Sequence, residues 1–223
     1  TEAWASVTAD FIAACSVAFA IFIAIATAPI FCGEWHNNTK ALIATTKHGW
    51  SRIGIVKVIV SFLFAIELYA IITISSILLQ IVFLGTEGAD MPIQCIKILA
   101  VAPWSVLQAE IYEYGYLLLA TLGYTGIVLL CSALTKTNYV SLITSLAIVF
   151  VPMSISQFLP LWGQKVFELI PFVGSSTDIF RTNAYHLFGY TIWSPYLLIT
   201  VPIILGLICL PFAVRSWARR AKM

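Results

Sequence analysis

Long apolar runs recur along this chain and constrain what it can fold into. The sequence is 61% hydrophobic and only 10% charged, and its mean hydropathy is +0.97. A soluble core built from 223 residues could not bury that much apolar surface. A bilayer interior is about 30 Å thick and takes roughly 20 helical residues to cross. The runs reach that length and lack the two-residue alternation of a membrane β-barrel, so the sequence predicts an all-α, polytopic membrane helical bundle.

Five membrane spans are expected, and together they form a single transmembrane domain over residues 1–223. The second run is longer than one bilayer crossing at about 1.5 Å per residue, so it should tilt or project beyond the membrane. The expected spans are 11–31, 53–84, 116–134, 139–159 and 195–214.

Basic residues orient the spans, because Lys and Arg are retained on the cytoplasmic side. One face would hold the polar segment 33–52, the turn at Lys136 and the C-terminal tail, with nine Lys and Arg against three on the other face. Acidic residues show the reverse bias, with Glu34 alone on the basic face and eight acids opposite it. The sequence therefore predicts a multi-pass protein of a bacterial cell membrane, with segment 33–52 and the C-terminus in the cytoplasm.

The same count places the N-terminus outside, where Glu2 and Asp10 stand instead of the basic flank of a signal peptide. One explanation is a further span upstream, which would make six in the full protein. The alternative is a five-span protein with an outside N-terminus.

Two outer segments, 85–115 and 160–194, mix apolar residues with Trp and Tyr. This composition is typical of short helices in the membrane interface, and ordinary loops with aromatic anchors are the alternative. The expected short helices begin at Met91 and at Pro103, the latter ending over 110–114, and cover 164–170 and 176–187, with a break at Pro171-Phe172.

No catalytic constellation is visible. The sequence contains no phosphate-binding loop, dinucleotide fingerprint, nucleophile elbow or metalloprotease helix. His36, His48 and His186 have no metal-ligand spacing with one another or with cysteine, and the five cysteines read as small apolar residues. We expect neither enzyme activity nor a bound cofactor or metal, and no nucleic-acid partner.

Glu67 is the one ionisable residue expected at mid-membrane, and such groups are candidates for function. Ser61, Tyr69 and Thr73 lie two to six residues away. The alternative is a structural carboxyl group, hydrogen-bonded to a hydroxyl on a neighbouring helix.

Gly123 and Gly126 lie three apart in the third span. One face of that helix should therefore let another helix approach closely. Packing within the chain and a subunit interface are both compatible with this pattern.

The polar segment between the first two spans has its own internal order. Residues 41–46 could form a short amphipathic helix, with Glu34 near its positive N-terminus and Lys47 near its negative end. Arg52 and Lys57 would extend to the cytoplasmic boundary.

This order resembles the ABC-2 type permeases of ATP-binding-cassette transporters: a span ending in an acidic residue, an Asn-Thr step, a short helix, an Arg, then a Lys entering the next span. The resemblance covers most of the chain and extends to the long second span and the Pro-Phe break. In that family the loop is a coupling helix docked on a separate ATPase. The residues that the resemblance assigns to the coupling loop are Glu34, Asn38, Thr39, Lys47, Arg52 and Lys57.

The resemblance implies an exporter permease that works as a dimer with a second permease copy or paralogue. ATP would be bound by the cytoplasmic ATPase subunit, and the cargo would be a hydrophobic or amphipathic peptide antibiotic, lipid or drug, as in antibiotic resistance. Two other hypotheses stay open: a secondary transporter or channel that uses Glu67, and a non-transporting membrane scaffold subunit.

Overall fold

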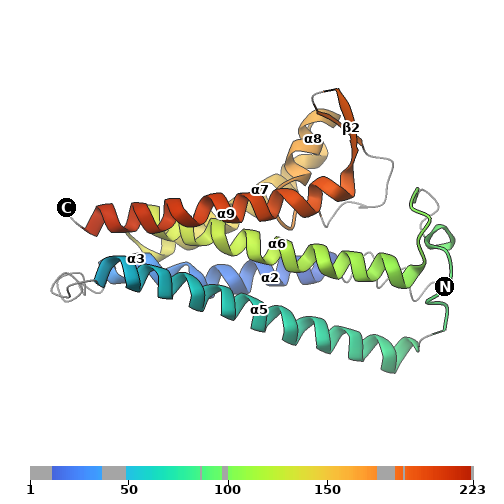
Figure 1. The fold of residues 1–223 in the computed structure, drawn as a ribbon, viewed down its shortest axis with the longest axis horizontal. Coiled ribbons are helices and arrows are strands. Elements are labelled where there is room, and N and C mark those ends of the chain that lie inside the picture. The colour runs from blue at the N-terminus through green and yellow to red at the C-terminus, as the bar shows by residue number, and fades with distance from the viewer. Residues whose placement is uncertain are drawn as a thin grey trace.

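Five long apolar helices dominate the computed structural model of the chain (Figure 1). Each is long and apolar enough to cross a membrane: Ala14–Glu34, Arg52–Phe83, Val106–Leu134, Asn138–Phe158 and Ser194–Arg219. The predicted number of spans is confirmed, and the third span begins ten residues earlier than expected. The structure describes residues 12–36, 49–85, 87–96, 100–174, 184–187 and 189–221.

The first span is made of two helices that meet at Pro29, and the fourth is α7 followed by a short 3-10 turn. Each of the other three spans is one helix. The helices are α2 (Ile12–Thr27), α3 (Pro29–His36), α5 (Gly49–Leu84), α6 (Val106–Leu134), α7 (Asn138–Ile155), α8 (Leu161–Glu168) and α9 (Ser194–Ala221). Two single 3-10 turns, η2 (Ile93–Cys95) and η3 (Ser156–Phe158), and two strands, β1 (Ala184–Leu187) and β2 (Tyr190–Trp193), complete the described elements.

Helix α6 is the central element of the bundle, and α2, α5, α7 and α9 all pack against it (Figure 1). In its most apolar stretch 61% of the residues are buried, against 11% for α5. Helix α5 contacts the bundle along one face and diverges from α6 toward its C-terminal end (Figure 1). Most of the surface of α5 therefore lies outside the protein core.

Aromatic rings fill the space between α2, α6 and the turn that follows α8. The ring of Phe172 lies 6.5 Å from that of Phe19 and 5.3 Å from that of Tyr124. The Tyr124 hydroxyl donates a 3.0 Å hydrogen bond to the Ser145 carbonyl on α7. Phe172 has a φ of 70°, so the predicted Pro171-Phe172 break is confirmed, and the sharp turn directs the ring into the core.

Glycines bring α6 and α9 into backbone contact. A Cβ atom on Gly123 would lie 2.5 Å from the Pro202 carbonyl oxygen, and one on Gly126 would lie 3.0 Å from the Gly206 Cα. The predicted close approach is confirmed, and within the chain the approaching helix is α9.

Ser132 of α6 closes the break in the first span. Because Pro29 has no N–H, it cannot continue the hydrogen-bond ladder of α2. The Ser132 Oγ donates to the Ala28 carbonyl at 2.6 Å and accepts from the backbone N–H of Phe31 at 3.0 Å and of Cys32 at 3.3 Å. One hydroxyl thus satisfies three backbone groups that have no water to bind inside a bilayer.

The segment that enters α6 differs from its prediction. No separate helix lies over 103–114, because α6 begins at Val106 and continues into the span. Ser105 and Gln108 form a reciprocal capping box that starts the helix there. At Met91-Pro92 the predicted helix is reduced to the single 3-10 turn η2.

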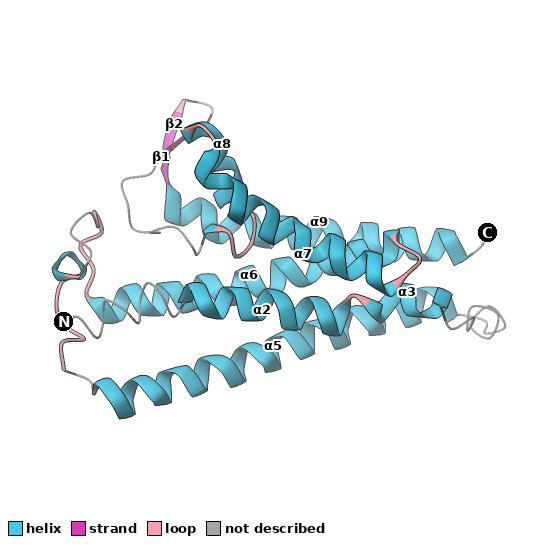
Figure 2. Ribbon diagram, turned by 180° about the vertical axis from the view of Figure 1, so that it is seen from behind, coloured by secondary structure: helices cyan, strands magenta, loops and turns pink. Residues whose placement is uncertain are grey.

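The segment between α7 and α9 was predicted only in part. Helix α8 agrees in place with the amphipathic helix expected over 164–170, beginning three residues earlier. The prediction of a helix over 176–187 is wrong for its last four residues, which form strand β1. This strand pairs with β2 as an antiparallel hairpin, in the register Ala184↔Trp193 to Leu187↔Tyr190 (Figure 2). Aromatic and β-branched residues favour strands, and Gly189, with a φ of 85°, forms the turn. Residues 175–183 lie outside the described part.

Candidate functional site

An ion pair joins the two helices that flank the predicted coupling loop. Glu34 lies near the end of α3 and Lys57 in the third turn of α5, and the Lys57 Nζ is 2.5 Å from the Glu34 Oε1. The same ammonium group donates a 2.6 Å hydrogen bond to the Ile30 carbonyl. Both side chains are mostly buried, with exposed fractions of 20% and 16%, so solvent screens the pair less than it would a surface pair.

Two aromatic rings pack beside this pair. The Lys57 Nζ lies 5.6 Å from the ring centroid of Phe31 and 5.3 Å from that of Trp217 on α9. Both rings are buried and lie 5.3 Å apart. Gly54 leaves room for the indole, since a Cβ atom there would lie 3.1 Å from it. The pair therefore links α3, α5 and α9 at one point.

The predicted coupling residues are only partly brought together. Glu34 and Lys57 are in contact, whereas Arg52 is exposed. Asn38, Thr39, Lys47 and the helix expected over 41–46 lie outside the described residues. Lys57, expected to extend to the cytoplasmic boundary, turns to Glu34, because the Glu34 carboxylate and the Ile30 carbonyl lie within reach of its ammonium group. The Glu34 carboxylate is therefore paired with the Lys57 ammonium group.

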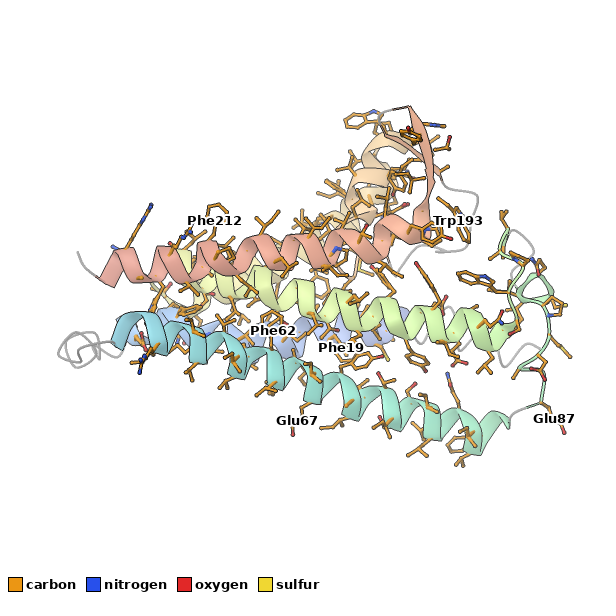
Figure 3. All side chains as sticks on the ribbon, viewed as in Figure 1. Phe19, Phe62, Glu67, Glu87, Trp193 and Phe212 are labelled. Carbon is orange, nitrogen blue, oxygen red and sulfur yellow. The ribbon has the colours of Figure 1, made fainter. Side chains whose placement is uncertain are left out.

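Glu67 lies on the outer face of α5 and points away from the other helices (Figure 3). It shares this face with Val60, Leu63, Ile71 and Ile74, which are 55–61% exposed. Ser61 and Thr73 are buried and the Tyr69 hydroxyl donates to the Tyr114 carbonyl, so these neighbours face the bundle. Within the described part of the chain, the structure does not bring Glu67 together with any hydrogen-bonding group.

We expect Glu67→Leu to leave the free energy of unfolding of the chain within about 0.5 kcal/mol of wild type, because an exposed side chain without partners contributes little to the fold. Tyr69→Phe on the same helix is the matched control and should lose about 1 kcal/mol with its hydrogen bond. Unfolding by SDS, followed by circular dichroism in one detergent, compares the two. A loss at Glu67 larger than that at Tyr69 would support the structural role that the sequence left open.

Sequence reasoning missed a second polar site, between α5 and α6 at the end of the bundle opposite the Glu34–Lys57 pair. Gln80 and Glu110 are buried there, and the Ser76 hydroxyl lies 2.8 Å from the Tyr114 hydroxyl. The spacing of Ser76 and Gln80, four residues apart on one helix face, was a usable signal. Glu110 was expected in an outer segment, and the early start of α6 places it near the beginning of a helix long and apolar enough to cross a membrane.

The β-hairpin is fastened to α8 by polar contacts. The Lys165 ammonium donates to the Ala184 carbonyl, and the Tyr185 hydroxyl donates to the Lys165 carbonyl, both at 2.9 Å. Burial and the nearby Glu168 carboxylate raise the pKa of Tyr185 above its ordinary value, so the hydroxyl keeps its proton and remains a donor. These contacts hold the hairpin in place.

Among the described residues no group of three or more His, Cys, Asp or Glu side chains is placed to hold a metal ion.

Comparison with known proteins gives no relative: no protein-family model, curated protein or solved structure matches this chain.

Proposed function

We propose that the chain is the membrane-spanning permease subunit of an ABC-2 type ATP-binding-cassette exporter. It would carry a hydrophobic or amphipathic cargo, such as a peptide antibiotic, a lipid or a drug. A separate cytoplasmic subunit would bind and hydrolyse ATP, and a second permease copy or paralogue would complete the pathway. The chain itself would contribute no hydrolytic residue.

The observation that carries this proposal is the Glu34–Lys57 ion pair. It clamps together the two helices between which residues 37–48 connect α3 to α5. If an ATPase moved that connecting segment, the movement would be transmitted to α5 through Lys57. It would be transmitted to α9 through Trp217, which lies beside the Lys57 ammonium group. Since both helices pack on α6, movement at one end would be transmitted to the bundle as a whole.

The proposal predicts that Glu34→Lys uncouples ATP hydrolysis from transport. The substitution places two ammonium groups together, so the clamp opens while the apolar contacts of the bundle remain. In proteoliposomes holding the chain and the ATPase subunit that copurifies with it, we expect ATP hydrolysis to stay within about two-fold of wild type. Efflux should fall about ten-fold or more, as expected for an unfavourable charge contact of roughly 1.4 kcal/mol or more.

Two further variants control this experiment. Lys136→Glu changes a charge on the exposed turn between α6 and α7, outside the ion pair itself, and should transport normally. The charge swap Glu34→Lys with Lys57→Glu should restore part of the efflux, because the opposite charges meet again. Normal transport by Glu34→Lys alone would refute the coupling role.

The secondary-transporter hypothesis makes a different prediction in the same vesicles. Transport driven by an ion gradient without ATP, and abolished by Glu67→Gln, would replace the exporter proposal. The outward position of Glu67, without described partners, favours the exporter, for which Glu67→Gln should retain ATP-driven efflux. A complex that hydrolyses no ATP and moves no cargo would instead indicate a scaffold subunit.

A further inference from the structure

A cavity of about 290 Å³ lies between α5 and α6, at the end of the bundle opposite the Glu34–Lys57 pair. Its wall is almost entirely aliphatic, and the turn that carries Glu87 follows α5 at this end (Figure 3). This volume is close to the lower limit, roughly 300 Å³, of sites that hold small molecules. The side chains that carry the argument are Ile81, Gln80, Leu107, Glu110, Ile111 and Tyr114.

Two polar groups line this cavity, and none of the ion pairs among the described residues gives either of them a cation. Glu110 is 5% exposed and Gln80 is 9% exposed. Gln80 and Tyr114 are the neutral hydrogen-bonding neighbours of the Glu110 carboxyl group, but the Glu110 Oε1 and the Gln80 Nε2 make no well-formed hydrogen bond. A buried carboxylate without a cation is costly, and so is a buried amide without an acceptor. The cavity therefore offers one strong acceptor and one donor to whatever enters it.

The side chains at the opening of the cavity are apolar. Ile111 and Ile81, which line the cavity, are 63% and 51% exposed. They lie on the sides of two helices that are each long and apolar enough to cross a membrane. A ligand with an apolar tail could thus enter from within the bilayer, where a fully hydrated ion could not.

We propose that this cavity binds a primary ammonium group carried on an apolar tail. The ammonium group donates to the Glu110 Oε1, and the Gln80 amide donates to an acceptor oxygen of the ligand or to a water beside the ammonium group. The tail lies against Leu107 and Ile111. Neutral and anionic amphipaths of the same length are bound less well, because they leave the carboxylate unpaired. This site would exist whether or not an ATPase drives the chain.

The test is equilibrium binding of radiolabelled dodecylamine and dodecanol to the chain in phosphatidylcholine nanodiscs, whose lipid has no N–H donor. A hydrogen bond to a charged group contributes about 1.5–3 kcal/mol, which corresponds to roughly ten- to a hundred-fold in affinity. We expect saturable binding of the amine at least about ten-fold tighter than that of the alcohol. Glu110→Gln should reduce this preference to about two-fold or less.

Glu67→Gln is the matched control, because it neutralises a carboxyl group on the same pair of helices but outside the cavity, and it should keep the full preference. Leu107→Trp fills the cavity while Glu110 stays in place, and it should abolish saturable binding of both probes. If Glu110→Gln does not fold, Leu107→Trp still tests the site. Equal affinity for amine and alcohol in wild type, or an unchanged preference in Glu110→Gln, would overturn the proposal.

The ammonium group could belong to a membrane lipid or to a separate amphipathic amine. Phosphatidylethanolamine added to the nanodiscs distinguishes the two sources. If it displaces dodecylamine in proportion to its share of the lipid, an aminophospholipid headgroup is the ligand. If dodecylamine stays bound, the site selects a single-tailed amine.

Discussion

Gly123→Ala should lower the free energy of unfolding by about 2 kcal/mol or more, although alanine is the better helix former. The added Cβ would lie 2.5 Å from the Pro202 carbonyl oxygen and 2.9 Å from the Pro202 carbonyl carbon. Both are backbone atoms, so no side-chain rotation can relieve the clash and α9 must move away from α6. Overpacking of a well-filled contact typically costs about 1–3 kcal/mol, and Gly123→Leu should prevent a monodisperse folded preparation.

Gly115→Ala is the matched control for this experiment. Gly115 lies in the same helix, two turns earlier, and a Cβ atom there would meet nothing within 4 Å. Its replacement should be neutral or stabilising by up to about 1 kcal/mol, as glycine-to-alanine changes in helices usually are. SDS unfolding of both variants in one detergent measures the difference. Equal stability of the two would mean that α6 and α9 are not in backbone contact.

Ser132→Ala should cost about 3 kcal/mol, a large effect for the loss of one oxygen atom. The Ser132 hydroxyl satisfies the Ala28 carbonyl and the N–H groups of Phe31 and Cys32 at the Pro29 break. A buried backbone group left without a partner costs about 1–3 kcal/mol. Part of the loss is recovered, because the Ala28 carbonyl also accepts from the Ser141 hydroxyl at 3.2 Å.

Ser75→Ala provides the comparison. Its hydroxyl is exposed and bonds only to the Ile72 carbonyl within its own helix, so its loss should stay within about 0.5 kcal/mol. Thermal unfolding followed by circular dichroism reads out both variants. If Ser132→Ala is no less stable than Ser75→Ala, the hydroxyl is not what closes the break.

Local pattern was enough for most of the fold. The five helices follow from runs of apolar residues that only a bilayer could accommodate, and the Phe172 turn follows from the Pro171-Phe172 pair. The short elements were harder to predict. Ser105 and Gln108 extend α6 by a capping box, and Tyr185 and Ile192 favour strands over helix only when a partner strand is present to pair with.

The candidate site divides in the same way. The chain order of Glu34 and Lys57 suggested a shared loop, but their direct contact depends on α3 and α5 coming together. The sequence could not show which carboxyl side chains are buried in the folded protein. Glu67 and Glu110 are both carboxyl groups within apolar surroundings, yet the first is exposed and the second is 5% exposed.

The sequence by itself determined that this chain is a bundle of five membrane-length helices, because hydropathy and length are properties of each segment alone. Only the tertiary structure decided which carboxyl groups have partners. That depends on how each helix is rotated about its axis, and the rotation is set by contacts such as Gly123 with Pro202 and Ser132 with Ala28, between residues far apart in the chain.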